Sequence, residues 1–285
     1  ETIVRADLVV DASGRAVPTL DLLDRLGRPR PDVTEIGVDI GYATAIFAMP
    51  ETARDETPIV VTHPVAPESS RAGLLVPVEN GRWVVTLAGM HADKPPGDHA
   101  GFLAFAAGLR TRTIHDRIRS CTPLGGIARF GFPASVRRHF EGVADFPRGL
   151  LPFGDSLCRF NPLYGQGMSV RAQEACLLRR LLDTLAGSPD ALDRLAPAFL
   201  ADAQTLSDAP WLATVPVDLC YPHTTGERPE DHVQQLKFGA ALRRVAARDA
   251  DVHRLMVEVM HLLKPRGALR EPAVFERIKA EMAAA

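Results

Sequence analysis

The chain has 285 residues, of which 46% are hydrophobic, so it is long enough to bury a full core and to form more than one lobe. Lys and Arg number 33 against 35 Asp and Glu, a balance that excludes a global field for nucleic acid or for an anionic membrane. No apolar run reaches the roughly 18 residues of a membrane span, so we expect no transmembrane segment.

The cysteines, Cys121, Cys158, Cys176 and Cys220, are widely spaced and form no C-x-x-C pair. This spacing argues against a zinc site and against a disulfide framework, so we expect no bound metal. It also favours a reducing compartment, and we expect a cytoplasmic protein.

The first predicted elements are a short strand and a helix. Residues 6–10 form a mostly apolar run that ends in Asp11-Ala12-Ser13-Gly14, the pattern of a strand followed by a turn. Asp11 and Gly14 stand where a strand delivers its C-terminal end to a ligand crevice, although an ordinary turn has the same composition. Residues 20–26 predict one or two helical turns.

The middle of the chain predicts an antiparallel sheet. Over residues 35–47, bulky side chains alternate with small ones, so one strand face is bulky and the other is nearly bare. A bare face indicates close packing of another element or, less often, the floor of a ligand site. Residues 59–62 predict a further strand, and Asn80-Gly81 predicts a two-residue hairpin loop that places Val78 opposite Trp83.

Two short helices are predicted at residues 100–109 and 112–119, and extended segments follow at 127–132 and 135–140. The last segment carries Arg137-Arg138-His139. Such a basic trio is an ordinary solvated face or an anchor for a cofactor phosphate or an acidic substrate.

Residues 150–174 read as a strand, a carboxylate, a turn and the start of a helix. An apolar run precedes Gly154-Asp155, and Asn161-Pro162 leads into Gly165-Gln166-Gly167. A helix N-terminus leaves backbone N–H groups unpaired and carries partial positive charge, so it suits an anion or the electron-rich edge of a ring. Glycine lets a planar ligand approach the backbone, and the acid at the strand end is placed to hold hydroxyl groups.

The C-terminal third is predicted to be helical. The helix that begins near Gly167 runs to about Ala186, and one apolar face comprises Met168, Ala172, Ala175, Leu178 and Leu182. A second helix follows from Asp190 to about Leu206. Residues 211–222 are predicted to be irregular, and residues 230–263 to form a long helical segment.

These motifs, taken in their joint order and spacing, resemble a known family. The run 9–15 that contains Asp11, followed by Gly154-Asp155, Pro162 and Gly165-Gln166-Gly167-Met168, is similar to the two later flavin fingerprints of aromatic-hydroxylase-type FAD-dependent monooxygenases. Within that superfamily it most resembles bacterial oxidoreductases similar to 2-polyprenyl-6-methoxyphenol hydroxylase. Ser169 departs from the Asn that is common in the family.

The resemblance implies a cofactor site. In the family, the acid of G-D bonds the ribityl hydroxyls of FAD, the proline lies near the isoalloxazine, and the backbone of the G-Q-G-M turn meets the pyrimidine edge of the ring. The implied cofactor-binding residues are Asp11, Gly14, Gly154, Asp155, Pro162, Gly165, Gly167 and Met168. No catalytic residue is assigned: Tyr42, His63 and His91 are the candidate bases, but residues of these types are more often ordinary packed or solvated side chains.

Family members also hold the ADP half of FAD with an N-terminal strand, a G-x-G-x-x-G turn and a helix, and this sequence contains no such fingerprint. We therefore expect a mixed α/β chain in which part of a Rossmann-like FAD-binding domain, lacking its N-terminal βαβ segment, occupies 1–32 and 133–187. An antiparallel-sheet substrate domain is expected at 33–132 and a helical C-terminal region at 188–285.

The implied activity is that of a monooxygenase: NAD(P)H reduces FAD, O2 adds at the flavin C4a position, and the hydroperoxide transfers one oxygen to a small apolar or aromatic substrate. A flavin-dependent epoxidase and an isoprenoid reductase are the alternatives among enzymes. Outside enzymes, the alternative is a fragment that does not bind the cofactor and serves as a binding or oligomerisation module. A homodimer is the candidate assembly.

Overall fold

In the computed structural model, which describes residues 3–53 and 59–284, the strands form one parallel pair and two antiparallel sheets. The chain divides into two compact units. Unit 1 comprises Glu1–Ile36, Ser135–Val217 and Gly226–Ala285, and unit 2 comprises Gly37–Ala134 and Asp218–Thr225. The mixed α/β class is confirmed, whereas the functional domain ranges stay a prediction.

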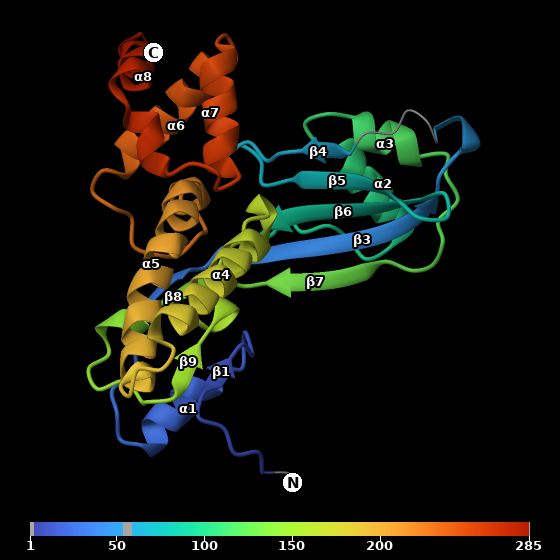
Figure 1. Cartoon of the computed structure of the whole chain (residues 1–285). Helices are drawn as coiled ribbons and strands as arrows, with labels where there is room; N and C mark the ends of the chain where they lie inside the picture. The colour runs from blue at the N-terminus through green and yellow to red at the C-terminus, as the bar shows by residue number, and fades with distance from the viewer. Residues whose placement is uncertain (1–2, 54–58, 285) are drawn as a thin grey trace. The chain divides into compact units, whose positions relative to one another are not determined.

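Unit 2 is built on a five-stranded antiparallel sheet in the order β4-β5-β6-β3-β7. Its strands are β3 (Ile40–Ala48), β4 (Val60–Thr62), β5 (Ala72–Val78), β6 (Arg82–Met90) and β7 (Ala128–Phe132). Helices α2 (His99–Ala107) and α3 (Thr113–Ile118) cover one face of this sheet (Figure 1). The Asp98 side chain caps α2 by accepting a hydrogen bond of 2.8 Å from the Gly101 N–H.

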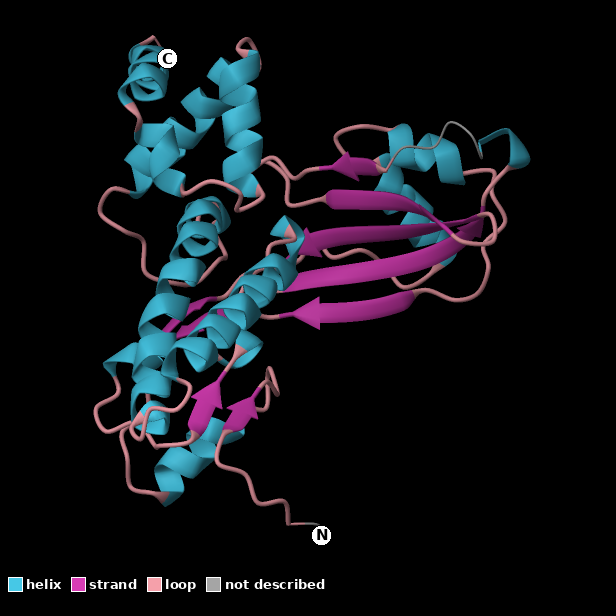
Figure 2. Ribbon diagram, viewed as in Figure 1, coloured by secondary structure: helices cyan, strands magenta, loops and turns pink. Residues whose placement is uncertain are grey.

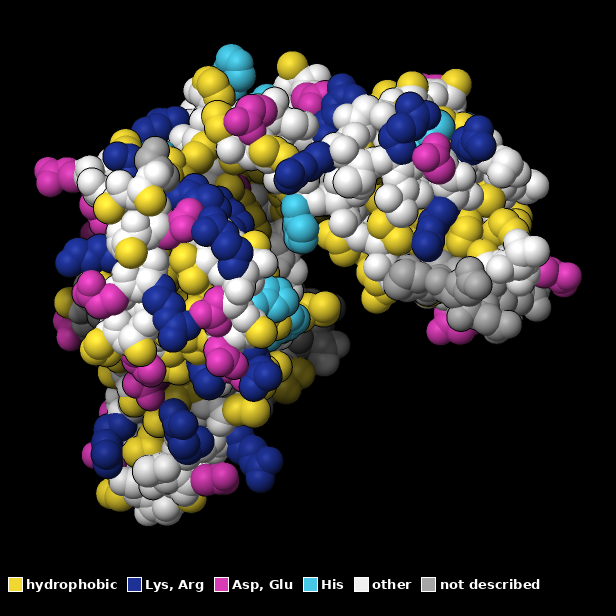
Figure 3. Space-filling model, turned by 90° about the horizontal axis from the view of Figure 1, so that it is seen from above, with side chains coloured by type: hydrophobic (Ala, Val, Ile, Leu, Met, Phe, Trp, Pro, Cys, Tyr) yellow, Lys and Arg dark blue, Asp and Glu magenta, His cyan; other side chains and the backbone are white. Residues whose placement is uncertain are grey.

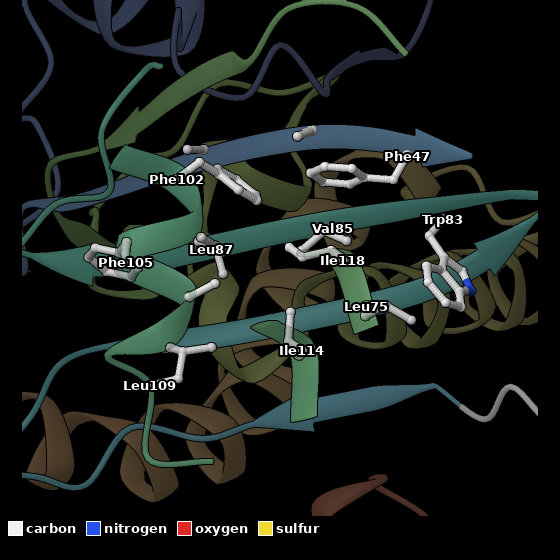
Figure 4. Close-up of a cluster of buried hydrophobic side chains, with 13 residues drawn as sticks. Phe47, Leu75, Trp83, Val85, Leu87, Phe102, Phe105, Leu109, Ile114 and Ile118 are labelled. Carbon is white, nitrogen blue, oxygen red and sulfur yellow. The ribbon is translucent and has the colours of Figure 1, made fainter. Parts of the chain in front are cut away.

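The bare face of β3 is the one that the helices cover. Ala43 and Ala45 are buried in a core with Phe102 of α2 and Ile114 of α3, and Figure 4 shows the helix side chains directed at the sheet. Small residues on the strand let the aromatic rings of α2 approach the backbone closely. The interpretation of the bare face as a packing surface is therefore confirmed, and the ligand-floor alternative for this face is wrong.

Two local predictions in unit 2 need correction. The hairpin at Asn80-Gly81 exists, but its register pairs Val78 with Arg82, so the loop has three residues and Trp83 lies opposite Pro77. The strand predicted over residues 35–47 is interrupted, because Asp39 adopts a left-handed backbone with φ of 41°. Its first part is β2 (Val33–Ile36), which belongs to a sheet of unit 1.

Unit 1 contains the parallel pair of short strands (Figure 2) and a three-stranded antiparallel sheet in the order β10-β8-β2. The remaining strands are β1 (Val9–Asp11), β8 (Ser135–Arg138), β9 (Leu150–Pro152) and β10 (Cys158–Arg159). The helices are α1 (Pro18–Arg25), α4 (Gly167–Leu185), α5 (Ala191–Asp218), which ends one residue beyond the unit, α6 (His232–Ala246), α7 (Ala250–Met260) and α8 (Pro272–Ala283). The C-terminal region is thus helical, as predicted.

Three helix predictions were wrong in detail. The buried residues of α4 are Val170, Glu174, Leu177 and Leu185, so the predicted apolar face is mostly exposed, with Met168 at 86%. Helix α5 continues through Pro210 and Pro216 across the segment predicted to be irregular. The segment 230–263 is interrupted near Asp249, whose side chain caps α7.

The visible surface mixes basic and acidic side chains and does not gather one sign (Figure 3), as the balanced composition predicts. Within the part of the chain that the structure describes, no helix has both the length and the apolar character needed to cross a bilayer.

Candidate functional site

The parallel pairing of β1 with β9 brings the two predicted turns to one edge. Val10 pairs with Leu151 and Asp11 with Pro152, so both strands end side by side. Gly14 follows β1 in a left-handed conformation with φ of 70°, and a Cβ at this position would lie 3.7 Å from the Cβ of Asp155. Two motifs separated by about 140 residues in the sequence therefore meet at the C-terminal edge of the strands.

Asp11 is a buried carboxylate that holds the first turn together. One oxygen accepts hydrogen bonds from the Ser13 N–H at 3.1 Å and the Ser13 hydroxyl at 2.6 Å, and from the Ser156 hydroxyl at 3.3 Å. The other accepts from the Thr19 N–H at 3.1 Å and the Thr19 hydroxyl at 2.5 Å. Burial raises the pKa of Asp11, but these bonds together outweigh burial, and the pKa lies below its ordinary value. Both oxygens are thus engaged inside the protein.

Asp155 lies in a 3₁₀ turn, η3 (Gly154–Ser156), and points outward. Its side chain is 49% exposed and lies 3.5 Å from the Arg171 guanidinium. Gly154 begins the turn with φ of 69°, a conformation that favours glycine. Arg138 donates to the Ser156 carbonyl at 3.1 Å and fixes the turn from the side of β8. An exposed carboxylate on a rigid turn is available to accept bonds from a ligand's hydroxyls.

A buried ion pair on α4 clamps this turn. Glu174 is fully buried and accepts a bond of 2.9 Å from the Gly154 N–H, while its other oxygen is bonded by Arg171. Arg171 also donates to the Cys158 carbonyl and lies over the Phe160 ring at 5.2 Å. Burial raises the pKa of Glu174, and the Arg171 charge opposes that rise.

The sequence interpretation missed Arg171 and Glu174 as site residues. The signal was present, because residues three apart on a helix lie on neighbouring turns and opposite charges at that spacing pair.

The glycine turn precedes α4 and is open. It follows the 3₁₀ turn η4 (Pro162–Tyr164), and Gly165 takes φ of 68°. A Cβ at Gly165 or Gly167 would meet no atom within 4 Å among the described residues. Gln166 makes no side-chain cap, so the first-turn N–H groups of α4 have no capping acceptor from it. The Met168 side chain is exposed, and the predicted contact of this residue with the flavin ring would be made by its backbone.

The basic trio does not form an anchor. Arg137 pairs with Asp208 at 2.6 Å, and His139 contacts Glu141 at 3.0 Å and the Thr34 hydroxyl at 2.9 Å. Arg138 binds backbone carbonyls of the η3 turn. The solvated-face interpretation is also incomplete, because all three side chains contact another element: Arg137 contacts α5, Arg138 contacts η3, and His139 contacts β2.

The three candidate bases lie in unit 2, where each can be described by itself. Burial raises the pKa of Tyr42, and the nearby Asp218 charge raises it further, so the Tyr42 hydroxyl stays protonated at neutral pH. His63 is exposed. His91 contacts the Thr224 hydroxyl at 3.2 Å, and burial lowers its pKa, so its imidazole is neutral at pH 7.

An apolar groove of about 410 Å³ runs beside the parallel pair. Its lining comprises Val10, Ala12, Phe153, Ala175, Leu178, Arg179, Leu182 and Asp183. Val9 and Val10 of β1 are 54% and 41% exposed, and β1 pairs with a strand on one side only in the described sheets. Within residues 3–53 and 59–284, no three His, Cys, Asp or Glu side chains form a group that could hold a metal.

Comparison with known proteins places the chain in a fold. No protein-family model matches it. Protein Rv3254 of Mycobacterium tuberculosis is 33% identical over 227 residues, which are 80% of this chain and 47% of that protein. The flavin-dependent brominase Bmp2 is similar at a TM-score of 0.59 and 13% identity, over 99% of this chain and 62% of that one. The Diels-Alderase PyrE3 is similar at a TM-score of 0.54 and 16% identity, over 89% of this chain and 49% of that one.

The chain thus has a mixed α/β fold that it shares with the flavin-dependent brominase Bmp2 and the Diels-Alderase PyrE3, and it spans between 47% and 62% of the length of the proteins that it matches. The narrower resemblance to 2-polyprenyl-6-methoxyphenol hydroxylase stays a prediction. Because one protein of this fold is described as a Diels-Alderase, the fold by itself does not define the reaction.

Proposed function

We propose that this chain supplies the ring and ribityl half of an FAD site in a flavin-dependent monooxygenase. The observation that carries the proposal is the meeting of the Gly14 turn and the exposed Asp155 carboxylate at one strand edge, with Arg171 of α4 lying 3.5 Å from Asp155. The open glycine turn directly precedes that helix. Asp155 would accept bonds from the ribityl hydroxyls. The backbone at Gly165 and Gly167 would contact the ring, and the positive end of α4 would favour negative charge at its pyrimidine edge.

The remaining predicted residues have supporting roles in this proposal. Both carboxylate oxygens of Asp11 already accept hydrogen bonds inside the protein, so Asp11 would shape the first turn. The backbone near Gly14 would make the direct contact with FAD. Pro162 would flank the ring, and Met168 would contribute its N–H. Bound flavin supplies the redox chemistry with NAD(P)H and O2, while this chain binds, orients and excludes water.

The substrate would lie on the face of the five-stranded sheet that α2 and α3 leave uncovered. Thr44 and Thr86 share a hydroxyl contact of 2.8 Å on that face, and Phe130 is 59% exposed. Tyr42 is 6.1 Å from Phe130 between ring centroids. A surface of aromatic and hydroxyl groups suits a small apolar or aromatic substrate.

The groove along β1 and α4 supports the expectation of a further adenosine-binding segment. Strand β1 has an unpaired edge on which Val9 and Val10 are exposed, and an apolar stripe of α4 lies beside it. In parallel sheets such edges and apolar faces are usually covered by a further strand and helix. The proposal assigns the pyrophosphate and adenosine to that segment. The residues described here would then bind riboflavin, FMN and FAD alike.

The test is a titration of the chain with riboflavin, FMN, FAD and lumiflavin, followed by flavin fluorescence. The first three should bind within about threefold of one another, and Asp155→Ala should weaken riboflavin about tenfold, the loss of one charge-assisted hydrogen bond. Lumiflavin, which has no ribityl chain, should be unaffected by that change. Asp202→Ala, at an exposed position of α5 outside the groove, is the control. Equal riboflavin affinity in Asp155→Ala and the wild type, or no binding at millimolar riboflavin, would overturn the proposal.

A second candidate function is a non-redox cyclase or binding module on the same fold, which the likeness to a Diels-Alderase favours. It predicts that a bound flavin is not reduced in the course of the reaction. Anaerobic photoreduction of the riboflavin complex, followed by exposure to O2 with a phenol or a polyene, separates the two. An oxygenated product supports the monooxygenase, and re-oxidation without any product supports the second candidate.

A further inference from the structure

The C-terminal helices α6, α7 and α8 form a small bundle with its own core inside unit 1. The buried members are Ala241, Leu242, Ala246, Val252, Leu269 and Ile278. Helix α7 ends at Met260, and Leu262 beyond it is left-handed with φ of 58°. The last carbonyl groups of a helix accept no hydrogen bond within the helix, so they need donors from elsewhere.

Two glutamines of α4 and its preceding turn donate to this helix end. The Gln166 side-chain amide donates to the Met260 carbonyl at 3.0 Å, and the Gln173 amide donates to the Leu262 carbonyl at 3.4 Å. Gln166 stands between Gly165 and Gly167, whereas Gln173 lies almost two turns further along the helix.

The glycine turn leaves open space where a side chain would stand at Gly165 and Gly167. No atom would meet a Cβ at Gly165 or Gly167 within the described residues, so side-chain packing does not hold this backbone in place. The Gln166 amide is a tether from the turn to α7, and Gln173 fixes the same two elements along their length.

We infer that the end of α7 is a positioning element for the glycine turn, with Gln166 and Gln173 as its positioning residues. The inference rests on the proposed flavin site. Because the turn and the end of α7 are bonded to each other, a ligand that orders the turn also stabilises the end of α7, and loss of the tether weakens the ligand by the same free energy.

The test uses Gln173, which lies away from the proposed ring contacts. Gln173→Glu has nearly the same shape but no donor, and it directs a carboxylate at the Leu262 carbonyl, whereas Gln173→Lys restores a donor. Gln173→Glu should weaken riboflavin about 3- to 10-fold, the loss of one hydrogen bond. Gln173→Lys should bind as the wild type does, and so should Gln234→Glu at an exposed site of α6.

Hydrogen exchange supplies a readout that a purely structural role would not move. The amides of Leu263 and Lys264 bond to the Glu258 carbonyl at 2.9 and 3.3 Å, just beyond α7. Saturating riboflavin should slow their exchange in the wild type and in Gln173→Lys, and should slow it less in Gln173→Glu, where only the Gln166 bond to Met260 still joins the two elements. If the wild type binds riboflavin without any change at these amides, the inference is wrong and the flavin site stands. If the wild type binds no riboflavin, the proposed function itself fails.

Discussion

Glu174 and Gly154 are joined by a hydrogen bond of 2.9 Å between a fully buried carboxylate and a backbone N–H. The bond ties the strand-end turn to the helix whose N-terminus completes the candidate site. Arg171 neutralises the same carboxylate from one turn earlier. A buried charge is costly unless it is paired and bonded, so this pair holds the turn only while both members are present.

Removal of the Glu174 carboxylate should therefore destabilise unit 1. Glu174→Ala leaves the Arg171 guanidinium and the Gly154 N–H without their acceptor, which we expect to lower the free energy of unfolding by about 3 kcal/mol. Urea unfolding followed by circular dichroism measures this change. Asp183→Ala breaks an exposed i,i+4 pair with Arg179 and should cost about 0.5 kcal/mol or less. Similar losses in the two variants would contradict the clamp.

Asp11 and Glu174 should give the unfolding free energy opposite dependences on pH. The pKa of Asp11 is lowered in the folded state, so its contribution is present above the ordinary value of 3.8 and is lost as the pH falls through the folded value. Burial raises the pKa of Glu174, so the folded chain holds a proton on this carboxyl at pH values where the unfolded chain has released it. The stability that the protonated carboxyl contributes is therefore lost as the pH rises from 4.5 through the folded pKa.

Urea titrations from pH 3 to pH 7 test these signs. Asp11→Asn should flatten the wild-type loss of stability below about pH 4, and Glu174→Gln should remove the decline above about pH 4.5. A Glu174→Gln profile that is parallel to the wild type across the whole range would show that the carboxyl titrates normally.

Features fixed by a few neighbouring residues were predictable from the sequence. Asn80-Gly81 favours left-handed backbone at both positions, so the hairpin was expected, although its loop length depends on the register of long strands. The strand-end motifs at Asp11 and Gly154 were also expected, because each consists of an apolar run that ends in an acid and a glycine.

Features that depend on distant contacts were not predictable in this way. Helix α4 carries two apolar stripes, and the one that is buried includes Glu174, which a hydropathy pattern assigns to solvent. The charge is buried because Gly154 and Arg171 satisfy it, and no periodicity shows that. The break at Asp39 requires an aspartate in the left-handed region, and steric clashes make that conformation uncommon for residues other than glycine.

His91 should make the stability of unit 2 depend on pH near neutrality. Burial lowers its pKa, His223 and Lys94 add to this effect, and Asp39 opposes it. The unfolded chain therefore binds a proton at His91 at a higher pH than the folded chain. The stability that neutral His91 contributes is therefore fully present above pH 6.5, and it is lost as the pH falls towards the pKa of His91 in the folded chain. His91→Gln should flatten the urea-unfolding profile between pH 5 and pH 7 relative to the wild type, and parallel profiles would contradict the prediction.

Three glycines form a row across β6, β3 and β7, where Gly41 pairs with Gly89 on one side and with Gly131 on the other. A Cβ at Gly89 would lie 1.8 Å from the Asp93 carbonyl oxygen, which is backbone and cannot move aside. A Cβ at Gly41 would meet the flexible stem of Lys94 at 2.7 Å. At Gly131 it would meet nothing within 4 Å among the described residues.

The loss in the free energy of unfolding on substitution of each glycine by alanine should therefore depend on how easily the neighbouring atoms can move. Gly89→Ala should lower the free energy of unfolding by about 3 kcal/mol, because overpacking forces the backbone to shift. Gly41→Ala should cost an intermediate amount, about 2 kcal/mol, because the Lys94 stem can turn while its Cβ at 2.9 Å and its ion pair with Asp39 limit the movement. Gly131→Ala should be neutral or stabilise by up to about 1 kcal/mol, because alanine reduces the freedom of the unfolded chain. Urea unfolding of the three variants gives the order, and a Gly131→Ala loss as large as that of Gly89→Ala would contradict the close approach at Asp93.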